Sequence, residues 1–233
     1  MKIYFSGVAL SEGKIKYSDA RLEKLDEKFK PKKVVPFFAE FTSQDLTGCE
    51  AMVIKKEKIL DLLIPDIDKL ENRLAKSADE KEKNFIKKCI GILEDEKPLC
   101  DERWSDDELF ILNGLAPMSA KPVLVLEEEK DADEIIKKTL EKAGLLFFYT
   151  VNKNELKSWL VKKGSDIITC AGKIHSDFAK GFIKADVINY NDFAGVYNMC
   201  EAKDKGLVKT VDRDHIIQDG DIIEIRFNVS KKT

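Results

Sequence analysis

The chain has 233 residues, of which 43% are hydrophobic and 36% charged, and its formal net charge is −3. This composition is typical of a globular protein with a highly charged surface, and the length suits one large or two small domains. No apolar run approaches the roughly 20 residues that span a bilayer. No segment is basic enough to give the large electrostatic footprint of a protein that binds free nucleic acid. The short apolar start, MKIYFSGVAL, has no basic leader, so we expect a buried strand there and a cytoplasmic protein without a membrane segment.

The cysteines and histidines do not form a recognisable metal or disulfide pattern. The five cysteines are at positions 49, 89, 100, 170 and 200; their number is odd and no two form a C-x-x-C pair. Reduced and mostly buried thiols are therefore expected, rather than a disulfide framework or a zinc site. The two histidines, His175 and His215, are far apart in the sequence, and no His-rich metal centre is predicted.

The first 57 residues predict short strands around one helix. Residues 1–10 favour a buried strand that ends near Gly7, and residues 18–30 an amphipathic helix. Residues 34–41 are apolar and β-favouring but contain a proline, which suits an edge strand or a strand start. Residues 51–54 predict one further short strand.

A helical hairpin is predicted next, over residues 58–117. Two apolar stripes recur at spacings of three and four residues, the first at Leu60, Leu63, Ile67, Leu70 and Leu74, and the second at Phe85, Ile86, Cys89, Ile90 and Leu93. Such stripes indicate two antiparallel helices that pack on each other, a self-packed coiled coil, in preference to a seam for a partner helix. Pro65 should kink the first helix or mark its true start.

Local signals divide residues 105–144 into helix, strand and helix. Ser105 and Glu108 form a capping box, in which each side chain can bond the backbone N–H of the other residue. A short helix to Gly114 should follow it. Residues 123–126 predict a buried strand, and residues 134–143 a helix.

The last part of the chain, residues 145–233, is rich in β-strand patterns. Four strand candidates read LLFFYTV, LKSWLV, FIKADVI and DIIEIRFNV, with a helical segment near 167–180 after the second and an inserted helix near 192–202. The resulting β-β-α-β-β order suits a small ubiquitin-like β-grasp sheet.

This part of the sequence resembles the carboxy-terminal TGS domain of the YchF/Obg-like ATPases, a branch of the translation-factor P-loop GTPases. The motifs that carry the resemblance are HSDF, KGFIKADV, YNDF, QDGD and RFNV, which occur in the family's order and at its spacing. The segment 19–41, DARLEKLDEKFKPKKVVPFFAEF, and the strand GCEAMVI are similar to earlier segments of the family. The resemblance implies that a nucleotide-binding domain precedes the TGS domain.

The nucleotide motif itself is incomplete. A P-loop has the pattern G-x-x-x-x-G-K-[ST], in which backbone N–H groups face the phosphates and the hydroxyl binds magnesium. Here Gly7, Gly13 and Lys14 are in place, but the glycine spacing is one residue too long and Ile15 replaces the hydroxyl. Glu12 would also place a carboxylate beside the phosphates. A turn that only resembles a P-loop is therefore the favoured interpretation.

The other nucleotide-binding segments implied by the resemblance are also altered. The family has a helix and a switch loop where only a few residues separate Lys14 from Asp19. Residues 45–48 spell D-x-x-G, but the pattern is shifted relative to the preceding strand and is interpreted as accidental. The KPVLVL segment is followed by three glutamates, where the family has a base-reading asparagine. These parts supply most of the electrostatic stabilisation of phosphoryl transfer.

We therefore expect an α/β protein with three parts. These are a reduced P-loop GTPase-like α/β core (residues 1–57 and 118–144), an inserted antiparallel helical hairpin (58–117) and a β-grasp TGS domain (145–233). The hairpin lies in an acidic stretch, since residues 59–144 hold 22 acidic and 14 basic side chains.

The functional hypothesis is a non-catalytic relative of the YchF proteins with a binding or adaptor role, associated with ribosomes or structured RNA through the TGS domain. Candidate RNA or ligand contacts are His175, Lys180, Lys184 and Arg226, and no cofactor is expected. One alternative is a weak hydrolase that binds ATP or GTP with magnesium through Gly7, Gly13 and Lys14. A second is a protein-interaction scaffold, in which the acidic hairpin binds a basic partner.

Overall fold

A computed structural model describes residues 1–228 of the chain, which form two compact units. Residues 1–15 and 38–143 form the first unit, and residues 16–37 join the segment that begins at Gly144 in the second. The domain division predicted from the sequence placed residues 16–37 in the α/β core instead. They belong to the second unit because their helix and strand pack on its sheet.

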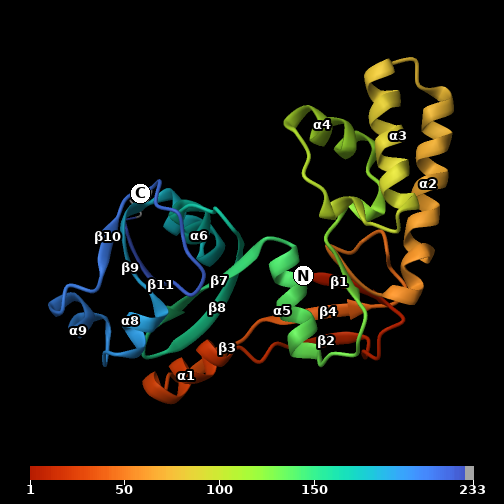
Figure 1. The fold of residues 1–233 in the computed structure, drawn as a ribbon. Coiled ribbons are helices and arrows are strands. Elements are labelled where there is room, and N and C mark those ends of the chain that lie inside the picture. Colours follow the sequence, from red (N-terminus) through yellow and green to blue (C-terminus); the bar gives the residue numbers. More distant parts are fainter. Residues whose placement is uncertain (229–233) are drawn as a thin grey trace. The chain divides into compact units, whose positions relative to one another are not determined.

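The first unit contains a five-stranded sheet with the strand order β2-β4-β1-β5-β6 (Figure 1). Its strands are β1 (Lys2–Ser6), β2 (Gly13–Lys16), β4 (Phe38–Thr42), β5 (Ala51–Lys55) and β6 (Val123–Leu126). The pairs β1–β4, β1–β5 and β5–β6 are parallel, so these four strands end at the same edge. The nearly continuous apolar runs of β5 and β6 are typical of parallel strands buried on both faces, whereas buried and more exposed residues alternate along β1 and β4.

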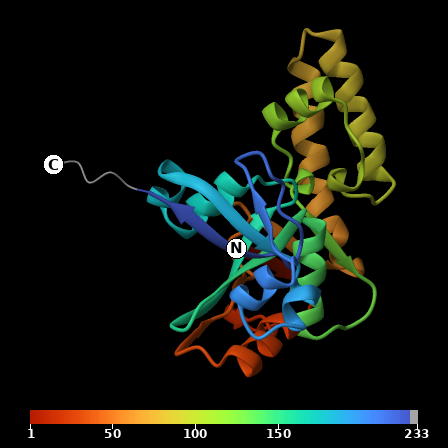
Figure 2. The same cartoon turned by 90° about the vertical axis from the view of Figure 1, so that its left-hand side faces the viewer.

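Helices cover this sheet and extend from it. They are α2 (Ile59–Lys76), α3 (Glu80–Glu94), α4 (Asp106–Leu115) and α5 (Ala132–Lys142), with 3₁₀ turns at Lys56–Lys58, Leu99–Asp101 and Met118–Ala120. The helices α2 and α3 lie side by side as the predicted hairpin (Figures 1 and 2). Their apolar stripes meet in one core with side chains of the sheet, so the seam is self-packed, except that the predicted member Leu60 is exposed and lies outside this core.

The structure decides two predictions for this region, the capping box before α4 and the position of Pro65. The capping box of Ser105 and Glu108 is confirmed at the start of α4. Pro65 lies inside α2, which continues from Ile59 to Lys76, so the proline does not mark the start of the helix.

The second unit contains a six-stranded sheet with the order β10-β9-β11-β7-β8-β3. Its strands are β3 (Lys33–Val35), β7 (Leu145–Val151), β8 (Glu155–Lys162), β9 (Phe182–Ile188), β10 (Lys209–Val211) and β11 (Ile222–Phe227). The last strand, β11, lies between β7 and β9, parallel to the former and antiparallel to the latter. The four strands predicted after residue 144 are therefore present, and Val229 of the fourth lies outside the described residues.

Helices cover both faces of this second sheet. They are α1 (Ala20–Phe29), α6 (Ile167–Ile174), α7 (Ser176–Lys180), α8 (Tyr190–Ala194) and α9 (Met199–Asp204). On one face, α6 packs over Leu146 and Phe148 of β7. On the other, α1 lies near β8, and its residue Leu25 is only 1% exposed. The sequence predicted one helix over 192–202, but Gly195 ends α8 and Asn198 caps a separate α9.

Candidate functional site

A nucleotide site in the first unit would lie at the edge where the parallel strands of its sheet end. Ligands of open α/β sheets bind outside the carboxyl ends of the strands. Here β1 ends at Ser6, β4 at Thr42, β5 at Lys55 and β6 at Leu126. The loop 7–12, which the sequence compares with a P-loop, follows β1 at this edge.

The loop 7–12 has a different conformation from a phosphate-binding loop. Gly7 has a left-handed φ of 71°, and the N–H of Leu10 donates to the carbonyl of Val8 at 2.9 Å. A P-loop passes into a helix, whose N-terminal N–H groups and dipole hold phosphate. In this chain Gly13 instead begins strand β2, which is hydrogen-bonded to β4 at the sheet edge. Lys14 therefore lies on a strand and is exposed to solvent.

Little space remains beside the end of β1. A Cβ atom added to Gly7 would lie 2.8 Å from the Cβ of Lys55 and 2.9 Å from the Cγ of Lys58, so the loop is in close contact with the start of the hairpin. The cavity lined by Ser6, Lys58 and Asp61 has a volume of about 20 Å³. That is room for about one water molecule, whereas small-molecule sites measure roughly 300–1,000 Å³.

The lysines along this edge already have carboxylate partners. Lys55 pairs with Glu129 at 3.1 Å, and Lys56 with Glu127 at 3.4 Å, so two of the three glutamates after β6 neutralise nearby lysines. Glu12 accepts hydrogen bonds from the N–H and hydroxyl of Ser43, which lower the pKa of its carboxyl. The edge therefore presents paired charges rather than a free cationic cradle.

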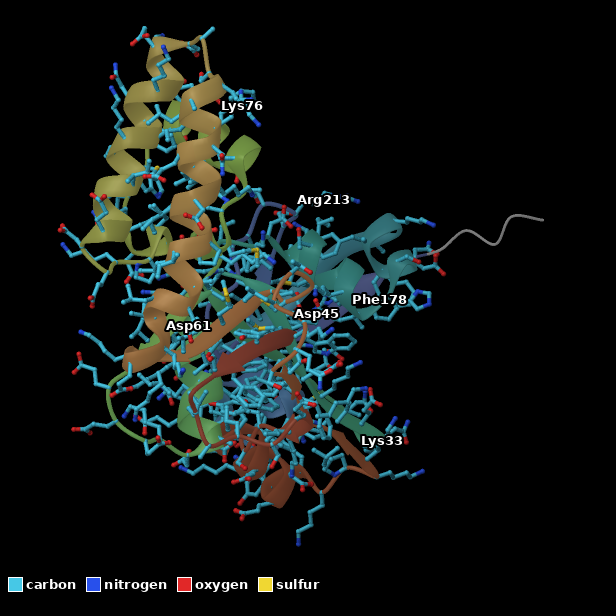
Figure 3. The ribbon with its side chains drawn as sticks, turned by 90° about the vertical axis from the view of Figure 1, so that its right-hand side faces the viewer. Lys33, Asp45, Asp61, Lys76, Phe178 and Arg213 are labelled. Atoms are coloured by element: carbon cyan, nitrogen blue, oxygen red, sulfur yellow. The ribbon has the colours of Figure 1, made fainter. Side chains whose placement is uncertain are left out.

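Asp45, the first residue of the D-x-x-G pattern, stabilises a turn. Its Oδ1 accepts the N–H of Gly48 at 2.8 Å, and its Oδ2 accepts the Nζ of Lys2 at 2.6 Å. These bonds lower the pKa of the Asp45 carboxyl, with the Lys2 hydrogen bond as the largest cause. Figure 3 shows Asp45 in the loop between β4 and β5, and Asp61 on the first turn of α2. The carboxylate of Asp45 has a structural role that accounts for its position.

The other candidate contacts lie on the second unit. His175 is the N-cap of α7, and its Nδ1 accepts the N–H of Asp177 at 3.1 Å. Its ring lies 5.8 Å from that of Phe178, which in turn lies 4.2 Å from the ring of Phe227. The side chain of His175 is 59% exposed, and Phe227 is 43% exposed. An exposed aromatic surface therefore exists beside α7, whose residue Phe178 is labelled in Figure 3.

The three basic candidates differ in their exposure and in the carboxylates that they contact. Lys180 is 77% exposed, and its Nζ lies 4.0 Å from Asp177. Lys184 pairs with Asp212 at 2.5 Å. Arg226 makes a two-pronged contact with the buried carboxylate of Asp186, at 2.6 and 3.1 Å. The alternation of β9 gave no sequence signal that a buried acid would hold this arginine.

Residues 1–228 contain neither a metal-binding cluster nor a helix that could span a membrane. No group of three or more His, Cys, Asp and Glu side chains there is placed to hold a metal ion. Within the same residues, no helix has both the length and the apolar character to cross a bilayer. The five cysteines are unpaired, and three of them are buried.

Comparison with known proteins connects these features to one family. Residues 145–228 match the family model YchF-GTPase_C, described as “Protein of unknown function (DUF933)”. The “Ribosome-binding ATPase YchF” of Bacillus subtilis (strain 168) is 24% identical over 327 aligned residues, which cover 93% of this chain and 89% of the relative. The alignment is longer than this chain, so it contains long gaps in the sequence of this chain opposite residues of the relative.

Two further matches agree with this result. “Obg-like ATPase 1” of Rattus norvegicus is 26% identical over 247 residues; the match covers 79% of this chain but only 62% of the relative, less than two thirds. The structure of the Schizosaccharomyces pombe YchF GTPase covers 97% of both chains with a TM-score of 0.78. Its sequence identity of 17% means that this likeness speaks for the fold alone. The C-terminal part of this chain therefore matches the YchF C-terminal family model, and the chain as a whole is similar to YchF and Obg-like ATPases.

Proposed function

We propose that this protein is a non-catalytic YchF-like protein that binds the ribosome, or structured RNA, through its C-terminal TGS-type unit. The observation that carries the proposal is the strand β2 at Gly13–Lys16, where a P-loop protein has a helix. Without that helix, the loop 7–12 lacks the row of N–H groups and the dipole that hold phosphates.

The lack of space beside β1 opposes nucleotide binding more strongly than the paired charges do. Exposed ion pairs contribute only about 0–1 kcal/mol each, so a triphosphate could displace Glu127 or Glu129 from their lysines at little cost. The cavity beside Ser6 and Lys58, of about 20 Å³, is too small for a nucleotide, and Gly7 is in close contact with Lys55 and Lys58. Opening it would require the start of α2 to move away from Gly7, and that helix carries buried side chains of the main core, Leu62 and Leu63.

Two observations support the ribosome as the partner: the names of the relatives and the exposed aromatic surface beside α7. Relatives of this chain carry the name “Ribosome-binding ATPase YchF”. The exposed rings of His175 and Phe227 provide a stacking platform, and Lys180 beside them provides a cation that is 77% exposed and only 4.0 Å from Asp177. Stacking of a base on an aromatic side chain contributes about 1–3 kcal/mol and tolerates any base. Arg226 and Lys184 are weaker candidates, because each already holds a carboxylate.

Co-sedimentation with purified ribosomal subunits, without added nucleotide, tests this proposal. We expect the protein in the pellet at low salt, and a loss of roughly tenfold or more in the double variant His175→Ala/Lys180→Glu, which removes a ring and reverses a charge. Lys24→Glu, on the exposed side of α1, makes the same charge reversal in the same unit and should sediment like the parent protein. Absence from the pellet, or sedimentation that requires ATP or GTP, would contradict the proposal.

A further inference from the structure

A second feature of the first unit has no place in the proposed function, namely an open groove between α2 and α4. The groove has a volume of about 840 Å³. Leu70 and Arg73 of α2 line one side, and Phe110, Ile111 and Leu115 of α4 line the other. Its size falls in the range of cavities that bury a drug-sized ligand, so it has room for more than one apolar side chain.

Phe110 stands exposed at this groove. Its side chain is 82% exposed, and the neighbouring Leu109 is 39% exposed. The inner side of α4 is covered, since Leu112 and Leu115 are buried in the core. A surface helix usually carries polar side chains on its outer face, whereas the outer face of α4 carries Leu109 and Phe110 beside its acidic first turn. The sequence LFILNGL therefore indicates a second contact partner for the outer face of α4.

The charges beside Phe110 are acidic and free. Asp106 and Asp107 precede Phe110 by four and three residues, so they lie on the same helix face as its ring. Within residues 1–228, neither carboxylate has a basic side chain at ion-pair distance. The basic residues of the groove are occupied instead. Arg73 pairs with Glu82 at 2.8 Å, and Lys69 donates to the carbonyl of Ala116 at 2.7 Å.

We propose that this groove binds an amphipathic helix of a partner protein, with large apolar side chains on one face and lysine or arginine beside them. The apolar face would pack on Phe110 and fill the groove, as in other helix-in-groove complexes. The basic side chains would pair with Asp106 and Asp107. A second copy of this chain fits less well, since residues 59–117 hold 15 acidic and nine basic side chains and would repel their own copy.

The test uses the full chain and three fluorescein-labelled synthetic peptides of 18 residues, followed by fluorescence anisotropy. One peptide has leucine and lysine in an amphipathic helical pattern, the second has glutamate in place of lysine, and the third is the first in a scrambled order. We expect saturable binding of the first peptide only. Phe110→Ala should weaken it at least tenfold, as is common for a central aromatic anchor. Asp106→Asn/Asp107→Asn should weaken it several-fold and reduce its salt dependence.

Tyr197→Ala is the matched control, because Tyr197 is 83% exposed but belongs to the second unit. It should bind the first peptide like the parent protein, and thermal melts should show all variants folded. Equal binding of the first and scrambled peptides, or an unchanged affinity in Phe110→Ala, would overturn the proposal. A dimer in analytical ultracentrifugation that Phe110→Ala abolishes would overturn it in favour of a second copy.

Discussion

Asp186 is fully buried in β9, yet its carboxylate meets three donors. Lys203 approaches at 2.8 Å, the hydroxyl of Thr210 at 2.8 Å, and Arg226 through two nitrogens. Burial would raise the pKa of Asp186, but the hydrogen bonds from Lys203, Arg226 and Thr210 outweigh it and hold this pKa below its ordinary value. The charged carboxylate therefore connects β9, β10, β11 and α9.

We predict that Asp186→Asn lowers the free energy of unfolding by about 1–3 kcal/mol at pH 7. This is less than for a fully buried pair, because Arg226 and Lys203 are partly exposed and can regain water. A lowered pKa in the folded state stabilises the protein above the ordinary value near 4, and this stabilisation is lost as the pH falls through the lowered pKa. The penalty should thus shrink below about pH 4.

Urea unfolding at pH 7 and pH 3 measures this difference. Glu224→Gln is the control, because it removes the same charge from an exposed side chain that pairs with Lys203 at 3.2 Å, and it should change stability by about 0.5 kcal/mol or less. An Asp186→Asn penalty of the same size at both pH values would contradict the account.

At the scale of residues, the sequence predicted local chemistry better than long-range partners. The capping box of Ser105 could be predicted because both of its bonds lie within four residues. The pairing of Arg226 with Asp186 could not, because it depends on the register of β9 and β11, whose partners are 40 residues apart. For Phe110, the apolar run on both sides of α4 was a usable signal, but the groove depends on the packing of α2.

At the scale of elements, the segment between β1 and β2 decides what the first sheet can bind. The sequence predicted a turn here in place of a P-loop, since few residues separate Lys14 from Asp19, but it did not predict the strand β2. The outcome for residues 34–41 was less predictable. Pro36 lies between β3 and β4, which belong to different sheets, and a pattern of alternating residues does not specify which sheet a strand joins.

We predict that Gly7→Ala destabilises the protein by about 1–3 kcal/mol, because the left-handed φ and the close contacts with Lys55 and Lys58 both oppose a Cβ. Gly91→Ala is the control. Gly91 lies in α3, where an added Cβ meets nothing within 4 Å, so that variant should gain about 0.5–1 kcal/mol. Thermal or urea unfolding gives both values. Neutral behaviour of Gly7→Ala would mean that the loop does not pack closely on the hairpin.

At the scale of the whole molecule, the sequence predicted the fold class and the four C-terminal strands but grouped α1 differently. Helix α1 belongs to the second unit through Leu22, Leu25 and the bond from the Tyr149 hydroxyl to Asp19. Arg21 adds a bond to Asp219 at 2.7 Å. These partners are more than 100 residues away along the chain, and an amphipathic helix alone does not show which sheet it covers.

Leu25→Ala should therefore destabilise the second unit, by about 2–5 kcal/mol. In native-state hydrogen exchange, we expect faster exchange of the amides in β7 and β8 and unchanged exchange in β1 and β5. Leu63→Ala, which removes an equally buried leucine from α2, should give the reverse pattern. If Leu25→Ala accelerated exchange in β1 and β5 instead, α1 would belong with the first sheet.

The proposed function depends on the lack of space for a nucleotide at the end of β1. Titration with nucleotide tests this most directly. Isothermal titration calorimetry of the full chain with magnesium and ATP, and separately with magnesium and GTP, should show no saturable heat. Hydrogen exchange of residues 7–14 should be the same with and without nucleotide. A dissociation constant in the micromolar range, with protection of the amides between Gly7 and Lys14, would contradict the account.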